Sequence, residues 1–176
     1  QDERSFSAPN LQYLMDSPIE LGPVVVREFA VADQTIRLAV HHGGPDAAVD
    51  RLARDAERIV REERAVFGEL PAYETGRYTL LGDFVPDAHS DGMEHRNSAV
   101  MTAPVSLERD HADVLQTIAH EFFHGWNVER IRPRSIEPFA FDRANASPDL
   151  WLAEGFTQYY GYLALCRAGL VDLRDT

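Results

Sequence analysis

The segment from Val114 to Val128 constrains the fold of this chain more than any other part of the sequence. It contains His120-Glu121-Phe122-Phe123-His124, has no proline, and has Gly125 as its one helix breaker. On a helix, residues four positions apart lie about one turn apart on the same face, so both imidazoles can reach one ion. Unpartnered imidazoles among apolar neighbours are costly. The pattern therefore predicts a helix that holds zinc, with Glu121 beside the ion and able to hold a water.

A third ligand is expected from the segment Leu150–Tyr160, in which Glu154 is the sole acid among apolar and aromatic residues. A buried carboxylate needs a counter-charge, and a cation held by two imidazoles would supply it. Three protein ligands and a water are typical of catalytic zinc, whereas structural sites use four protein ligands. We therefore expect one zinc ion per chain, bound by His120, His124 and Glu154. The alternative is a helix with two surface histidines and a solvated glutamate.

The remaining pattern indicates one α+β domain, for which 176 residues suffice. The helix expected between Val49 and Phe67 has apolar residues at three- and four-residue spacing and ends at Gly68. Residues 1–22 are expected to be irregular. Strands before helices favour helices packed on a mixed sheet. The other expected elements are strands at 24–29, 35–41, 73–85 and 98–102, of which the first two form a hairpin, and helices at about 111–128 and 149–169.

Composition narrows the classes of partner and of metal ligand. A formal charge of -12 disfavours extended contact with nucleic acid or anionic membranes. No apolar run approaches the roughly 20 residues of a membrane span. Because Cys166 is the single cysteine, no internal disulfide is possible, and metal ligands must be histidines and carboxylates. We expect a soluble protein, either cytoplasmic or, after removal of a leader, periplasmic or secreted. The oligomeric state stays open.

Longer motifs carry a family resemblance. The segments Thr117–Val128 and Trp151–Phe156 closely resemble the glycyl aminopeptidase family of gluzincin metallopeptidases. The resemblance implies a thermolysin-like catalytic domain, in which a mixed sheet is followed by the HExxH helix and a glutamate-bearing helix. It also implies His120, His124 and Glu154 as zinc ligands and Glu121 as the catalytic glutamate. The resemblance extends to further segments, namely Asn127–Pro133, Asp16–Pro18, Phe67-Gly68 and Gly92–Ser98.

Full-length members of that family carry a C-terminal helical subdomain and a PDZ domain. Residues 1–176 are therefore expected to be a peptidase catalytic domain that lacks both. The residue that stabilises the oxyanion comes from the later helical subdomain in related enzymes. Tyr159 and Tyr160 are candidates by their proximity to Glu154, and the alternative is that they pack in the core of an aromatic helix.

A second motif, Asp91–Ser98, resembles the Gly-x-Met-Glu-Asn exopeptidase motif of related aminopeptidases. The resemblance implies substrate binding by Gly92, Met93 and Glu94, with the Glu94 carboxylate gripping the free amino terminus of a peptide. A carboxylate at an open strand edge can do so while the strand pairs with the extended peptide. His95 stands where the relatives have asparagine, so a structural salt bridge is the alternative for Glu94.

These motifs predict zinc-dependent hydrolysis of the N-terminal residue of peptides. One alternative is a non-catalytic zinc-containing domain that binds peptides, and another is a metal-free helical interaction surface. Glu121 favours hydrolysis over the non-catalytic zinc domain, because a structural site needs no general base beside its ligands. The preferred residue and the choice between exopeptidase and endopeptidase activity stay open.

Overall fold

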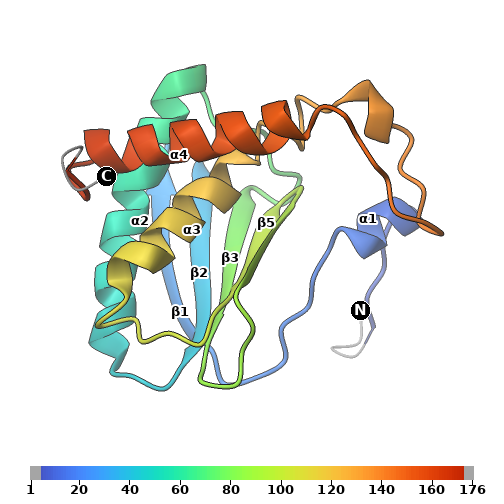
Figure 1. The fold of residues 1–176 in the computed structure, drawn as a ribbon. Helices are drawn as coiled ribbons and strands as arrows, with labels where there is room; N and C mark the ends of the chain where they lie inside the picture. Colours follow the sequence, from blue (N-terminus) through green and yellow to red (C-terminus); the bar gives the residue numbers. More distant parts are fainter. Residues whose placement is uncertain (1–4, 173–176) are drawn as a thin grey trace.

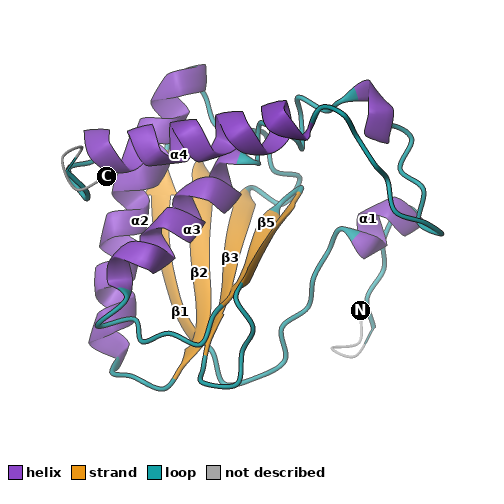
Figure 2. Ribbon diagram, viewed as in Figure 1, coloured by secondary structure: helices purple, strands orange, loops and turns teal. Residues whose placement is uncertain are grey.

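The computed structural model describes residues 5–172, which contain a five-stranded mixed sheet with helices against it (Figures 1 and 2). The strand order is β1-β2-β3-β5-β4. Pairs β1–β2 and β4–β5 are antiparallel, whereas β2–β3 and β3–β5 are parallel. Strand β4 therefore lies at an edge. The strands are β1 (Val25–Val31), β2 (Gln34–His42), β3 (Arg77–Phe84), β4 (Asp91–His95) and β5 (Ser98–Thr102).

The long helices lie on one face of the sheet (Figure 1). Helices α2 and α3 contact the strands, and α4 packs on both of these helices as an outer layer. The helical elements are α1 (Leu11–Met15), α2 (Asp46–Phe67), α3 (His111–Phe123), the 3-10 turn η1 (Arg134–Ile136), the π-helical turn η2 (Trp151–Gly155) and α4 (Phe156–Arg167). None of the helices within residues 5–172 is long and apolar enough to span a bilayer.

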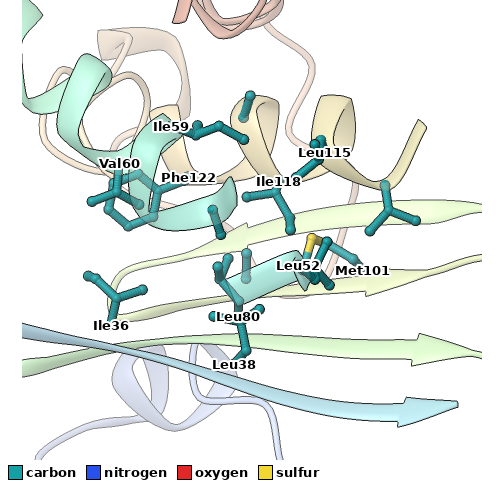
Figure 3. Close-up of a cluster of buried hydrophobic side chains, with 14 of the residues drawn as sticks. Ile36, Leu38, Leu52, Ile59, Val60, Leu80, Met101, Leu115, Ile118 and Phe122 are labelled. Carbon is teal, nitrogen blue, oxygen red and sulfur yellow. The ribbon is translucent and has the colours of Figure 1, made fainter. Parts of the chain in front are cut away.

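The core lies between the sheet and the α2–α3 layer (Figure 3). Alternate residues of β2 and β3 point into it, which is the two-residue period expected of strands with one covered face. The apolar stripe of α2 packs on these side chains. Helix α2 ends at Gly68, whose φ of 84° is a conformation that favours glycine. This core fixes α3 on the sheet and so positions its last turn.

The expected mixed sheet with helices is confirmed, but several predicted boundaries are wrong. The strand expected from residue 73 begins at Arg77, because Gly76 adopts a φ of 66° and turns the chain. The helix expected to reach residue 128 ends at Phe123. Beyond it the chain forms turns, in which the amides of Gly125 and Trp126 donate to the carbonyls of Phe122 and Phe123. The helix expected over 149–169 begins with the π-helical turn η2.

Helix α1 falls in a stretch expected to be irregular. Its N-cap is Asn10, whose Oδ1 accepts a hydrogen bond of 2.8 Å from the amide of Tyr13. Side chains more than seventy residues apart then join α1 to the β4–β5 turn. His95 Nδ1 lies 2.9 Å from Oδ1 of Asp16, and the Arg96 amide donates to the other carboxylate oxygen of Asp16 at 3.3 Å. These contacts hold α1 beside the edge strand.

Candidate active site

The sheet and the helices bring together three acceptor atoms from the predicted zinc ligands. His120 Nε2 lies 3.1 Å from His124 Nε2 and 3.1 Å from Glu154 Oε2. His124 Nε2 lies 3.5 Å from the same oxygen of Glu154. The two histidines come from the end of α3, and Glu154 comes from the π-helical turn η2. Residues 34 positions apart in the sequence thus converge on one point.

Hydrogen bonds on the far side of each ring fix the histidine tautomers. His124 Nδ1 lies 2.6 Å from the carbonyl oxygen of Asn127, and His120 Nδ1 lies 3.1 Å from Oε1 of Gln158. Because these oxygens only accept, each Nδ1 carries the proton and each Nε2 presents a lone pair. Burial, together with the neighbouring His124, lowers the pKa of His120, so this ring is neutral at neutral pH.

The three converging atoms fit a zinc ion. With both rings protonated at Nδ1, the lone pairs of the two Nε2 atoms and of Glu154 Oε2 face one another across 3.1–3.5 Å and repel. A cation between the three atoms would remove this repulsion. Ligand atoms about 2.0–2.1 Å from a tetrahedral zinc are roughly 3.3 Å apart, which agrees with these separations. The outer hydrogen bonds from Nδ1 are also those that metal-binding histidines usually make.

One expectation about this group is wrong. Glu154 was expected to be buried, but its side chain is 52% exposed. The π-helical turn projects this carboxylate towards solvent, whereas the side chain of His124 is 1% exposed. The buried acid of the site is Glu121, which is 5% exposed. The large apolar side chains next to Glu154 in the sequence do not bury it, since Trp151 is 66% exposed and Phe156 is 44% exposed.

Two residues without a role assigned from the sequence hold Glu154 next to the histidines. The side-chain amide of Asn127 donates to the carbonyls of Leu152 and Ala153 and to Oγ1 of Thr157, at 2.9–3.1 Å. Thr157 Oγ1 in turn donates to the Ala153 carbonyl at 2.6 Å. Asn127 and Thr157 are buried. Their positions three residues after His124 and Glu154 are the one signal in the sequence that would have pointed to them.

Glu121 lies beside the three acceptor atoms but contributes none of them. Its Oε2 is buried and has no hydrogen-bond partner within residues 5–172. Burial, and then the charges of Glu94, Glu154 and Asp91, raise the pKa of Glu121 to about 8. A cation at the neighbouring acceptors would offset this effect, because an opposite charge favours the ionised carboxylate. A carboxylate oxygen of Glu121 lies within 4.8 Å of a ring nitrogen of His124, so this acid is close to the place where the ion fits.

The edge strand β4 brings its motif to the same place. Carboxylate oxygens of Glu94 and Glu121 and a ring nitrogen of His124 lie within 4.8 Å of one another. Gly92 packs directly on Glu121, since a Cβ added to it would lie 2.1 Å from Glu121 Oε1. Met93 is 53% exposed. The structure therefore gathers Gly92 and Glu94 around Glu121, on a strand whose outer edge is open.

Comparison with known proteins bears on this arrangement. The sequence profile of the M61 glycyl aminopeptidase family matches residues 113–176, which include His120, Glu121, His124 and Glu154. This match confirms the resemblance to the glycyl aminopeptidase family. No curated protein matches the chain.

The fold also has a counterpart among solved structures. An aminopeptidase N family protein from Idiomarina loihiensis is similar to this chain, with a TM-score of 0.73 and 24% sequence identity. The similarity covers 86% of this chain and 26% of that protein, so the chain spans about a quarter of its length. At this identity the likeness concerns the fold.

Two cavities are lined by successive residues of β4, the first by Asp91 and Gly92 and the second by Met93, Glu94 and His95. The first, the His120 cavity, has a volume of about 570 Å³ and is lined by Gly92, His120, Glu121 and Gln158, among others. The second, the Glu94 cavity, has a volume of about 400 Å³ and is lined by Met93 and Glu94, together with side chains of α1 and of the loop after α3. Both volumes suit a group of small-molecule size.

The two candidate tyrosines lie elsewhere. Tyr160 stacks on Phe123, with ring centroids 5.2 Å apart, which agrees with the core-packing alternative. Tyr159 is 63% exposed and packs edge-on against Tyr160, so it is not a core residue. Within residues 5–172, neither ring lines the two cavities.

Proposed function

We propose that this chain is a thermolysin-like catalytic domain that removes the N-terminal residue of peptides by zinc-dependent hydrolysis. The observation that carries the proposal is the convergence of His120 Nε2, His124 Nε2 and Glu154 Oε2 beside the buried carboxylate of Glu121. The family match over residues 113–176 supports a peptidase. In this proposal the three converging residues are the zinc ligands and Glu121 is the catalytic residue.

The chemistry divides between the ion and the protein. When bound, zinc supplies a Lewis acid that activates water and polarises a carbonyl group. Glu121 accepts the proton of the attacking water and returns it to the departing amine. Glu121 suits this task because it is buried and its Oε2 has no hydrogen-bond partner among residues 5–172. A carboxylate shielded from solvent exchanges its proton with the bound water and substrate and not with bulk water.

Glu94 and the edge strand β4 position the substrate. The carboxylate of Glu94 makes no hydrogen bond or ion pair with residues 5–172, and it lies within 4.8 Å of Glu121 and His124. It would bind the ammonium group of a peptide whose backbone pairs with the open edge of β4. A carboxylate at this distance from the reacting centre leaves room for one residue before the cleaved bond, which favours aminopeptidase activity.

The test is hydrolysis by zinc-loaded protein with substitution of Glu121. Glu121→Gln should retain one zinc per chain and lose kcat by roughly 10²–10⁴, because it removes the general base and not a ligand. Glu20→Gln, at an exposed position, is the matched control. Zinc is measured by elemental analysis, and activity is measured on aminoacyl amides and internally quenched peptides. Equal rates for wild type and Glu121→Gln would refute the mechanism.

Two further results bear on the alternatives. Glu94→Gln should raise KM for substrates with a free amino terminus and leave N-acetylated substrates uncleaved, as in the wild type. Efficient cleavage of N-acetylated peptides would instead indicate an endopeptidase. A zinc-loaded wild type that binds peptides and cleaves none of them would favour the non-catalytic peptide-binding domain.

A further inference from the structure

The Glu94 cavity has walls that the proposed hydrolysis does not explain. Its lining combines side chains from three parts of the fold that are distant in the sequence, namely α1, β4 and the segment after α3. In Figure 1, α1 lies beside the outer turn of the loop between α3 and α4. The apolar members of the lining are Met15, Met93, Val128, Ile136, Phe139 and Phe141.

We propose that the Glu94 cavity holds the side chain of the substrate's N-terminal residue and selects a large apolar one, such as that of leucine, methionine or phenylalanine. This inference rests on the proposed function, which places the substrate's ammonium group at Glu94. It names the substrate class that the cavity favours. Glycine, with no side chain, would leave the cavity empty.

The apolar walls are only half covered in the free protein. Met15 is 60% exposed, Met93 is 53% exposed, and Phe139 and Phe141 are 43% and 45% exposed. The rings of Phe139 and Phe141 lie 5.4 Å apart and are tilted, so they form one continuous surface. A side chain that enters this hollow removes apolar surface of the protein and of the ligand from water, which stabilises the complex in proportion to the area removed. Such a gain is unavailable to glycine.

The acidic groups of the cavity favour an apolar side chain over a basic one. Asp16 pairs with His95 at 2.9 Å, and Glu129 pairs with Arg132 at 3.1 Å. Both carboxylates thus already have partners inside the protein. Glu94 makes no such pair within the described part of the chain, so one acid is left for one ammonium group. A second cation in the cavity would compete with the existing partners of Asp16 and Glu129 and would lose its own hydration.

The cavity wall from α1 is held in place by the edge strand itself. The Asp16 carboxylate binds both the His95 ring and the Arg96 amide, at the end of β4 that carries Glu94. The Asn97 side chain also donates to the Tyr13 hydroxyl at 3.4 Å. The apolar wall from α1 and the carboxylate of Glu94 are therefore both fixed by β4. A pocket that binds a side chain and the amine of the same residue requires such a fixed distance between the two parts.

The test measures binding of amino alcohols, which carry the amine and the side chain but no cleavable bond. Zinc-loaded protein is titrated calorimetrically with L-leucinol, L-lysinol and ethanolamine, the last of which has no side chain. L-leucinol should bind at least about tenfold more tightly than ethanolamine, and L-lysinol should not exceed L-leucinol. The Phe139→Ala/Phe141→Ala variant should bring L-leucinol close to ethanolamine. Phe6→Ala, which removes a 69% exposed ring outside the cavity, is the matched control and should change neither value.

Each outcome decides between the two proposals. Equal binding of the three ligands, tighter binding of L-lysinol, or an unchanged leucinol preference in the double variant would overturn the pocket. A leucinol preference without hydrolysis of any peptide would uphold the pocket and count against the enzyme. Where hydrolysis occurs, the kcat/KM ratio of leucyl over glycyl amides should follow the binding ratio and fall in the double variant. Hydrolysis that favours glycyl amides would uphold the enzyme and overturn the pocket.

Discussion

Replacing Gly92 by alanine should displace the Glu121 carboxylate without altering any of the three proposed zinc ligands. A Cβ at position 92 would lie 2.1 Å from Glu121 Oε1 and 2.8 Å from its Cδ. An ordinary contact needs about 3.5 Å, so the carboxylate oxygen must move by roughly 1.4 Å. It is confined on its other sides by burial and by the nearby Glu94 and His124. The added methyl group is therefore expected to move the carboxylate of Glu121, the proposed catalytic residue, and to leave the three acceptor atoms in place.

The expected cost follows from that displacement. A shift of about 1 Å in a catalytic group lowers the rate by roughly 10²-fold, or about 2.7 kcal/mol of transition-state stabilisation. Gly92→Ala should thus reduce kcat/KM about a hundredfold, with the zinc content unchanged. Gly43→Ala is the matched control, because a Cβ there meets no atom within 4 Å. The assay is the kcat/KM of leucyl amide hydrolysis, with zinc measured on the same samples.

A double-mutant cycle distinguishes movement of the carboxylate from movement of the strand. Glu121→Asp withdraws the carboxylate by one methylene and should be slow by itself. The atom of the shorter side chain that replaces Glu121 Cγ would lie about 3.2 Å from the new methyl group, so the overlap is smaller than the 2.1 Å approach to Oε1. Adding Gly92→Ala to Glu121→Asp should therefore cost less than the hundredfold loss. Multiplicative losses in the double variant, or wild-type rates in Gly92→Ala, would refute the reasoning.

Three other predictions concern the supports of the site and the core. Asn127→Ala should weaken zinc binding about 10–100-fold in competition with a chelator, since it removes the donor to the carbonyls of the η2 turn; unchanged affinity would contradict that role. Burial raises the pKa of Glu63 well above its ordinary 4.5, so wild-type stability should fall as pH rises from about 4.5 towards the folded pKa, by up to about 1.4 kcal/mol per pH unit. In chemical denaturation Glu63→Gln should have a smaller slope than the wild type and exposed Glu69→Gln should keep the wild-type slope, so equal slopes in all three proteins would contradict the assignment. Removing zinc held at a hundredfold excess over its Kd should cost about 2.7 kcal/mol and lower Tm by roughly 5–10 °C, and a His120→Ala/His124→Ala protein should show no such shift.

The parts of the fold that the sequence predicts are those set by local periodicity. Helix α2 and strands β1, β2 and β5 appear close to their expected positions, because each has an apolar face with a clear period. The four-residue spacing of His120 and His124 likewise fixes their relation on α3 before any tertiary contact is known. The predicted ligands meet because two of the three are placed by one helical turn.

The rest depends on contacts between distant segments. The five residues of α1 have a capping asparagine but no apolar period, and they are held by Asp16 binding His95 across 79 positions. The exposure of Glu154 follows from a π-helical turn, and its neighbours in the sequence gave no sign of that geometry. The cavity beside Glu94 likewise arises from three segments that no single stretch of sequence connects.

The turns after α3 explain why the predicted helix had to stop at Phe123. A helix continuing to residue 128 would bond its own backbone groups, and the Asn127 carbonyl would not turn back to His124 Nδ1. In the same segment Arg130 donates to the carbonyls of Gly125 and Arg96, which ties the end of α3 to the β4–β5 turn. Asn127 joins the same segment to the η2 turn by donating to the carbonyls of Leu152 and Ala153. The irregular backbone after α3 thus contacts the histidines, the η2 turn that carries Glu154 and the β4–β5 turn. One segment therefore fixes the relative positions of all three parts of the site. A longer regular helix would not make these contacts with its backbone.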